Sequence, residues 1–281
     1  MNPGDLVEAI RVLETDLPAD VEAALSRCEA EEEGNSKVVL GAILENARYA
    51  REKGIPMCQD TGTLIFFVRG APDASRAHEI IEEALIRATD EVPLRPNTVN
   101  PLSRENEGRN LGRWNPIVHF ERGRRADGRV EIGIMAKGAG SENVSRSYML
   151  DPDQGDEGVK MAVIDTVKAA GPKPCPPIVV GVGIGGNLEW SGYLAKRALM
   201  RRLDCEADDK EAARLEGELL CDINALGIGP MGFGGRNTAL KVNVEVGHCH
   251  TASLPVTVSI QCWALRRVVA EWNGEAFRVC R

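Results

Sequence analysis

Residues 172–186 read PKPCPPIVVGVGIGG and indicate the kind of fold to expect. The prolines favour a rigid, extended approach, because each ring fixes the backbone and removes an amide donor. The apolar run from Ile178 is typical of a short buried strand that ends in a glycine loop. A helix is expected directly afterwards, over 188–202. This order of elements is typical of a protein that mixes helices and strands.

The segments on either side continue the mixture. Helices are predicted over most of residues 1–53 and over 74–90, 156–170 and 209–224. The last early helix is expected to begin at Lys37, after a cap at Asn35-Ser36. Strands are predicted at TLIFFV after Gly62, in a hairpin over 117–134 that turns at 126–128, and in alternating segments at 242–246 and 256–260.

The predicted fold class is therefore mixed α/β (α+β). A helical N-terminal region is followed by strands with interleaved helices and glycine-rich loops. One domain over 1–281 is expected, with a conceivable sub-lobe boundary near 171–175. The polar segment from Pro93 to Asn115 has little periodicity, and so long an irregular segment is either disordered or functional.

Composition excludes several classes of protein. The net charge is −8, which disfavours nucleic acid because an acidic chain repels phosphates. The N-terminus has neither the basic nor the apolar region of a signal peptide, and the longest apolar run is too short to span a bilayer. We therefore expect a cytoplasmic protein without a membrane partner.

The chain has eight cysteines but no CxxC pair. A disulfide framework is not expected in a reducing cytosol, and the spacing does not match a zinc ribbon or a ferredoxin. Any metal site must therefore collect cysteines that lie far apart in the sequence.

Two segments place a cysteine in unusual surroundings. In the turn Cys58-Gln59-Asp60-Thr61-Gly62-Thr63, a thiol stands beside an amide, a carboxylate and hydroxyls. The alternative is an ordinary turn in which Asp60 and Thr61 bond their own backbone. Cys175 lies between prolines, which suits a metal thiolate of preset geometry, although a buried structural cysteine is the alternative.

Glycine-rich segments and cations could bind an anion. The segment GVGIGG at 181–186 matches GxGxxG, but no strand ending in an acidic residue follows about 20 positions later, so a nicotinamide site is not favoured. GIGPMGFGG at 227–235 is not a phosphate loop, because no Gly-Lys-Ser/Thr follows. One or two cations could bind a dicarboxylate, from the set Arg95, Arg104, Arg109, Lys137 and Arg146.

Taken in order, six segments resemble the alpha subunit of class I fumarases and the related L-tartrate dehydratases. They extend from about residue 35 to 267: MCQDTGT, PLRPNTVNPL, KGAGSEN, CPPIVVGVGIGG, LGIGPMGFGG and CWALRR.

The resemblance implies a [4Fe-4S] cluster bound by Cys58, Cys175 and Cys262, with one iron left open. Such an iron is a Lewis acid for a substrate carboxylate and hydroxyl. By the same match, the remaining cysteines are structural thiols: Cys28, Cys205, Cys221, Cys249 and Cys280.

The resemblance also implies the substrate contacts. Asp60 is the catalytic residue, and Gln59 and Asp60 touch the substrate. Arg95 pairs with one substrate carboxylate, and Gly138 and its neighbours offer backbone amides to the other.

Because this chain ends soon after Cys262, it resembles the two-subunit form, which implies a separate beta subunit and an α2β2 assembly. The expected reaction is the reversible hydration of fumarate to (S)-malate, since Ser141-Glu142-Asn143 looks more like the fumarases. One alternative is an L-tartrate dehydratase alpha subunit. Another is a non-catalytic iron–sulfur sensor or scaffold.

Overall fold

The computed structural model describes residues 2–71, 73–121, 128–275 and 277–280. It divides the chain into two compact units. Unit 1 is built from residues 1–19, 45–139 and 266–281, and unit 2 from residues 20–44 and 140–265. The mixed α/β class is confirmed. Residues 171–175, where the sequence suggested a sub-lobe boundary, lie inside unit 2.

The helical N-terminal region is confirmed. It contains α1 (Pro3–Thr15), α2 (Ala19–Glu31) and α3 (Gly34–Lys53). A capping box starts α1, where the Asn2 side chain accepts a hydrogen bond from the Gly4 N–H at 2.6 Å. Helix α3 begins at Gly34 rather than Lys37, because Ser36 does not act as its cap. Its hydroxyl instead donates to the carbonyl oxygen of Gly234 at 2.6 Å.

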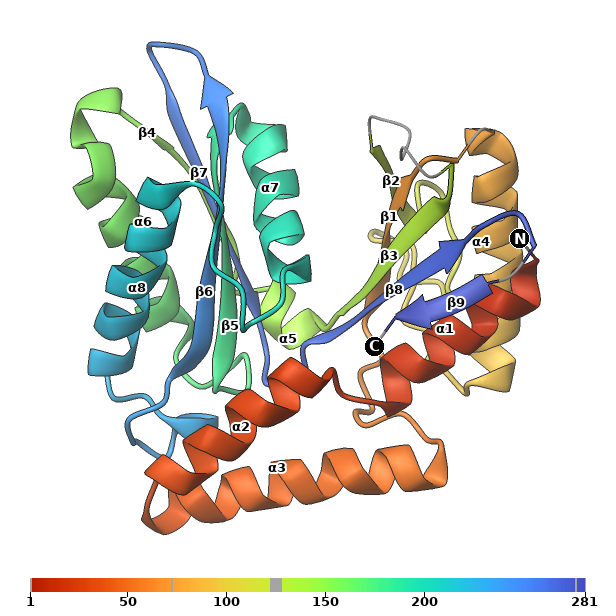
Figure 1. Ribbon diagram of the computed structural model, residues 1–281, viewed down its shortest axis with the longest axis horizontal. Helices are drawn as coiled ribbons and strands as arrows, with labels where there is room; N and C mark the ends of the chain where they lie inside the picture. The colour runs from red at the N-terminus through yellow and green to blue at the C-terminus, as the bar shows by residue number, and fades with distance from the viewer. Residues whose placement is uncertain (1, 72, 122–127, 276, 281) are drawn as a thin grey trace. The chain divides into compact units, whose positions relative to one another are not determined.

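Unit 1 contains a five-stranded sheet in the order β2-β1-β3-β8-β9 (Figure 1). Helix α1 packs against α4 (Ala74–Glu91), and both contribute to the hydrophobic core on one face of the sheet. The strands are β1 (Thr63–Arg69), β2 (Ile117–Glu121), β3 (Val130–Lys137), β8 (Arg266–Trp272) and β9 (Phe277–Cys280).

The hairpin expected over 117–134 is wrong. Both β2 and β3 pair with β1, β2 in parallel and β3 antiparallel, so they are not neighbours. The physical reason is burial. The five central residues of β1 are all buried, which requires a central place in the sheet, whereas β2 is partly exposed and lies at the edge. Residues 126 and 127 of the expected turn lie outside the described residues.

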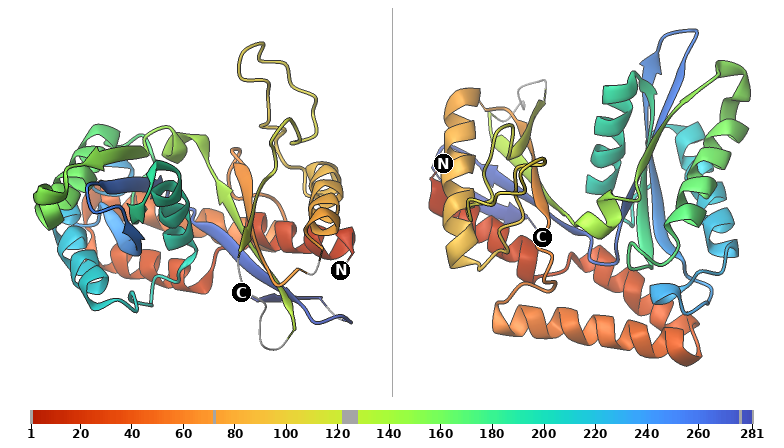
Figure 2. Two further views of the ribbon diagram at one scale, coloured as in Figure 1. Left: turned by 90° about the horizontal axis from the view of Figure 1, so that it is seen from above. Right: turned by 180° about the vertical axis from the view of Figure 1, so that it is seen from behind.

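Unit 2 contains a four-stranded sheet in the order β4-β7-β5-β6. Helix α7 (Leu188–Met200) covers one face, while α6 (Gly155–Ala170) and α8 (Lys210–Ala225) cover the other, as Figure 2 shows from two directions. The remaining elements are β4 (Arg146–Leu150), β5 (Ile178–Gly186), β6 (Ala239–Cys249), β7 (Leu254–Gln261), α5 (Ala139–Glu142) and the 3₁₀ turns η1 (Pro152–Gln154) and η2 (Pro230–Gly232).

The glycines of GVGIGG do not form a loop, because β5 continues to Gly186. A Cβ at Gly183 would lie 2.1 Å from the carbonyl oxygen of Ser191, and one at Gly181 would lie 2.3 Å from that of Ala195. These glycines therefore let α7 approach the backbone of β5 closely. Close packing of a helix on a strand explains the motif without a nucleotide.

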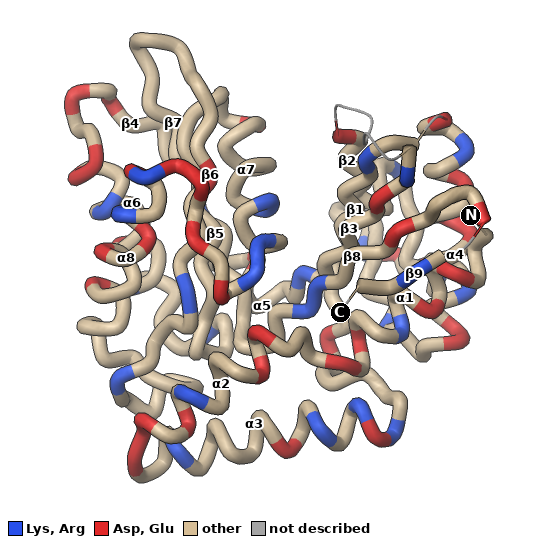
Figure 3. The backbone as a smooth tube through the Cα atoms, viewed as in Figure 1, with Lys and Arg blue, Asp and Glu red and all other residues tan. Residues whose placement is uncertain are grey.

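Acidic and basic residues are interspersed within each unit (Figure 3). Among the described residues, no helix has the length and apolar character needed to cross a membrane.

Candidate active site

The turn that carries Cys58 and Asp60 connects α3 to β1 in unit 1. The Met57 N–H donates to the carbonyl oxygen of Glu14 at 3.0 Å, and the Asn46 side chain donates to the carbonyl oxygen of Met57 at 2.9 Å. At the other end of the turn, Gly62 has a φ of +76°, and a Cβ there would lie 2.9 Å from backbone atoms of Lys137. The turn is thus fixed at both ends.

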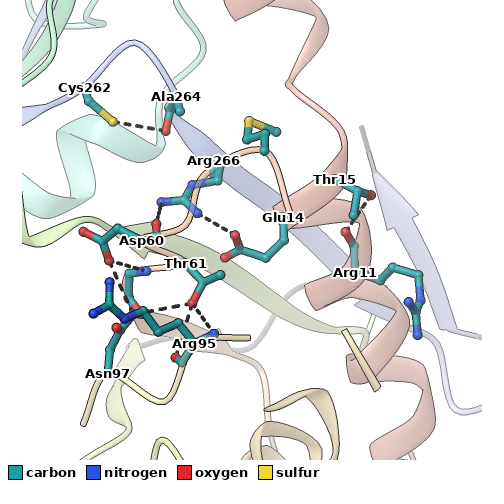
Figure 4. A network of polar contacts seen from close by, with 12 residues as sticks. Arg11, Glu14, Thr15, Asp60, Thr61, Arg95, Asn97, Cys262, Ala264 and Arg266 are labelled. Atoms are coloured by element: carbon teal, nitrogen blue, oxygen red, sulfur yellow. Dashed lines mark hydrogen bonds and ion pairs between the residues drawn. The ribbon is translucent and has the colours of Figure 1, made fainter. Parts of the chain in front are cut away.

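Three N–H donors orient the Asp60 carboxylate. Oδ1 accepts from the Gly62 N–H at 3.0 Å and from the Asn97 side chain at 3.4 Å (Figure 4). Oδ2 accepts from the Ala139 N–H at 2.8 Å. The contact with Gly62 is a hydrogen bond within the turn, as expected if Asp60 only stabilises an ordinary turn. The contact with Ala139 comes from the first residue of α5 and goes beyond that alternative.

Arg95 is tied to this turn through its backbone. Its N–H donates to Thr61 Oγ1 at 3.2 Å, and its carbonyl oxygen accepts from the Asn110 side chain at 3.2 Å. The guanidinium is exposed and makes no hydrogen bond or ion pair with the residues that the structure describes. Its planar fork therefore remains available to an incoming carboxylate.

Gly138 also lies beside Asp60, since a Cβ there would approach Oδ2 to 3.3 Å. The structure thus brings Asp60, Arg95 and Gly138 together in unit 1, although these residues are far apart in the sequence. Gln59 is exposed in the same turn.

The other predicted cations have different surroundings. Arg109 is paired with Glu107 at 2.9 Å, Lys137 is buried, and Arg146 lies on β4 in unit 2. Arg104 is exposed.

Cys175 and Cys262 lie on neighbouring segments of unit 2. The Trp263 N–H donates to the carbonyl oxygen of Cys175 at 3.3 Å. Cys175 has a φ of +55°, which is strained for a residue with a Cβ, and its thiol belongs to an exposed residue. Cys262 is half-buried, and its Sγ donates to the carbonyl oxygen of Ala264 at 3.7 Å. The third predicted ligand, Cys58, is half-buried and belongs to unit 1.

The donor chemistry fits an iron–sulfur cluster, since all three predicted ligands are thiols of residues that are not fully buried. Strain at a rigidly held cysteine is typical of a functional position. By contrast, Cys28 is buried in α2, and burial raises the pKa of its thiol to about 12. Such a thiol stays protonated, as a structural cysteine does.

The segment Ser141-Glu142-Asn143 has a largely structural role. The Ser141 hydroxyl is buried and donates to Gln261 Oε1 at 3.4 Å, while Glu142 forms an ion pair with Lys196 of α7. Asn143 alone of the three has an exposed side chain that makes no hydrogen bond with the described residues. Two of the three side chains in this segment are therefore held by other residues of unit 2.

Sequence reasoning missed a buried ion pair beneath the turn. Arg266 Nη1 donates to Glu14 Oε2 at 2.5 Å, and Nη2 donates to the carbonyl oxygen of Asp60 at 2.9 Å (Figure 4). Glu14 is 0% exposed and Arg266 is 1% exposed. The sequence did contain a signal that Glu14 is buried, because Glu14 follows Ile10 by four positions and so lies on the apolar face of α1.

Comparisons with known proteins identify a family and several relatives for this chain. The family described as "Fumarate hydratase (Fumerase)" matches residues 5–271. A "Putative L(+)-tartrate dehydratase subunit alpha" from Methanocaldococcus jannaschii is 48% identical over 270 residues, which cover 94% of this chain and 95% of the relative.

Two further relatives are more distant. The "L(+)-tartrate dehydratase subunit alpha" of Escherichia coli K12 is 33% identical over 91% of this chain and 86% of its own length. A "Putative fumarate hydratase class I" from Geobacillus stearothermophilus is 34% identical over 90% of this chain but only 51% of its own length.

Proposed function

Since the chain belongs to the fumarate hydratase (Fumerase) family, we propose that it is the alpha subunit of a two-subunit hydro-lyase for a four-carbon dicarboxylate. The resemblance expected from the motifs is confirmed at the level of the family. The observation that carries the proposal is the Asp60 carboxylate, which is oriented by three N–H donors in a turn that also binds the backbone of Arg95.

For the substrate, we place L(+)-tartrate first. The relatives that match most of their own length are described as L(+)-tartrate dehydratase alpha subunits. Loss of water from this 2,3-dihydroxy acid gives an enol, which tautomerises to oxaloacetate. The preference for fumarate rested on Ser141-Glu142-Asn143, and the contacts of the first two side chains within unit 2 weaken that argument.

Fumarate is the second candidate. The relative from Geobacillus stearothermophilus carries the description of a class I fumarate hydratase, and the matching family is named after that activity. The two reactions share removal of a proton from the carbon next to the one that loses hydroxide, so the same base serves both.

Asp60 is the proposed base. A carboxylate has about four lone-pair sites, and three of those on Asp60 accept hydrogen bonds. The remaining site is on Oδ2, which accepts only from Ala139. We propose that this site takes the substrate proton. Arg95 would bind one substrate carboxylate as a planar fork, and the amides at Gly138 and Gln59 would bind the remaining oxygens.

We further propose that Cys58, Cys175 and Cys262 hold a [4Fe-4S] cluster. Such a cluster supplies a Lewis-acidic iron that can bind a substrate hydroxyl and carboxylate. The backbone hydrogen bond from Trp263 to Cys175 supports the two ligands in unit 2, because it holds the Cys175 segment beside the residue that follows Cys262. Neither of these two cysteines is fully buried.

A separate beta subunit is the proposed partner, in an α2β2 assembly. The relatives named as alpha subunits imply such a partner, and this chain spans about half of the relative from Geobacillus stearothermophilus. The beta subunit would supply the groups that complete the site.

The test is anaerobic co-expression with the beta subunit, followed by iron and sulfide analysis and rate measurements. The substrates are L(+)-tartrate, D-tartrate, fumarate and (S)-malate. We expect the highest kcat/KM on L(+)-tartrate and no turnover by this chain alone. A higher kcat/KM on fumarate selects the second candidate. A complex with a full cluster that is inactive on all four substrates supports the sensor alternative instead.

A further inference from the structure

We propose that Glu14 and Arg266 are positioning residues that hold both ends of the segment from Met57 to Asp60 in its reactive arrangement. The proposal rests on the function proposed above, since it takes Asp60 as the base.

Glu14 contacts this segment in two ways. Its carbonyl oxygen accepts the Met57 N–H at 3.0 Å. Its side chain binds Arg266, whose second nitrogen donates to the carbonyl oxygen of Asp60 at 2.9 Å. A single residue of α1 therefore fixes the start of the segment directly and its end through Arg266. Between these two anchor points lie only Cys58 and Gln59, which are the proposed cluster ligand and a proposed substrate contact.

Stability alone does not explain this pair. Burial of two charges costs several kcal/mol per ion, and a well-packed apolar pair of similar volume is often equally stabilising. The cost is visible here, because Glu14 Oε1 is buried and has no hydrogen-bond partner among the described residues. An apolar pair, however, could not donate to the carbonyl oxygen of Asp60. The ion pair therefore adds a hydrogen bond to the carbonyl oxygen of Asp60 that an apolar pair could not supply.

The planar guanidinium is necessary for this arrangement. Arg266 uses one terminal nitrogen for the carboxylate and the other for the carbonyl oxygen, so it joins α1 to the turn in a fixed geometry. A lysine has one ammonium on a flexible stem and cannot reproduce the fork. Arg266 itself begins β8, where pairing with β3 holds its backbone.

The decisive experiment uses the reconstituted complex with its beta subunit. Three variants are compared: Arg266→Lys, Arg266→Met and the double variant Glu14→Leu/Arg266→Met. The matched control is Glu216→Gln, which breaks the partly buried pair with Arg201 in unit 2, whereas the turn belongs to unit 1. Rates are divided by cluster content, and hydrogen exchange of the peptide that contains residues 57–63 is measured in parallel.

We expect both Arg266→Met variants to lose roughly 10- to 100-fold in kcat per cluster with KM changed by less than about threefold, as misplacement of a reacting group predicts. Exchange in residues 57–63 should increase. Arg266→Lys should recover only part of the rate. The double variant should unfold at a temperature close to that of the wild type and still be slow. The control should lose stability but keep its kcat.

Two results would overturn the proposal. One is a folded Arg266→Met or double variant with kcat per cluster within about twofold of the wild type. The other is unchanged exchange in residues 57–63. The exchange measurement does not depend on turnover, so it reports on the pair even if the wild-type complex is inactive and the proposed function fails.

Discussion

Gly62 offers a quantitative test of how tightly the turn beside Asp60 is built. In the variant Gly62→Ala, the new methyl group must occupy a position 2.9 Å from the backbone nitrogen, carbon and oxygen of Lys137. The backbone must also keep a φ of +76°, which costs an alanine about 1–2 kcal/mol. A forced contact with backbone atoms adds about 1–3 kcal/mol. The expected loss in the free energy of unfolding is therefore roughly 2–5 kcal/mol.

Two other glycines separate these effects. Gly54 has a φ of +63°, but a Cβ there meets nothing within 4 Å, so Gly54→Ala should cost only the conformational ~1–2 kcal/mol. Gly41 lies within α3 without a positive φ, and its nearest neighbour would be a Glu29 oxygen at 3.8 Å. Gly41→Ala should therefore stabilise the protein by about 0.5–1 kcal/mol, because alanine is the better helix former.

The assay is urea denaturation followed by circular dichroism, with the three variants measured beside the wild type. The difference between Gly62→Ala and Gly54→Ala isolates the contact with Lys137. If that difference is below about 0.5 kcal/mol, the turn yields easily, and the claim that it is packed tightly against the end of β3 is wrong.

Four further predictions concern chemistry and pH. Asp60→Asn should lower kcat by about 10²- to 10⁴-fold with iron content unchanged, and a full rate would contradict its role as base. Arg95→Met should raise KM for the dicarboxylate, as steady-state kinetics can show. Cys262→Ser should lose iron while Cys28→Ser retains it; equal iron in both variants would contradict the ligand assignment. Burial raises the pKa of Glu14 from 4.5 to about 7, so the folded state binds this proton more readily than the unfolded state, and stability should fall as the pH rises from about 4.5 to 7. In the variant Glu14→Gln, the free energy of unfolding should no longer show this decrease with pH when it is measured by denaturation across the same range.

The spacing of apolar residues predicted those helices and strands whose pattern lies within a short stretch of sequence. The helices of the N-terminal region and the strand TLIFFV follow from the spacing of apolar residues, and the structure contains them as α1 to α3 and β1. Strand partners could not be predicted in the same way. Alternation identifies a strand but not its neighbour, which is why the expected hairpin proved to be two strands on either side of β1.

In the candidate site, too, local features could be predicted from the sequence, whereas contacts between distant residues could not. Asp60 stood out because of the residues beside it, but the Ala139 N–H that orients it comes from a distant part of the chain. Strand β8 was missed because its first two residues, Arg266 and Arg267, are charged and resemble a solvated end. In the fold, Arg266 is among the largest fully buried side chains. A charge that is buried for a specific contact contradicts the average pattern on which sequence reasoning depends.

The chain path through unit 1 has a consequence for biosynthesis. The sheet of unit 1 needs β8 and β9, and the ribosome makes these strands only after every residue of unit 2. Unit 2 can therefore fold during translation, whereas α1, β1 and β3 must wait for their last partners. Until Arg266 emerges, the backbone of Asp60 lacks one of its anchors. The three proposed cluster ligands, Cys58, Cys175 and Cys262, are all translated before Arg266, so the turn that carries Cys58 and Asp60 would reach its final arrangement only after these ligands are in the chain.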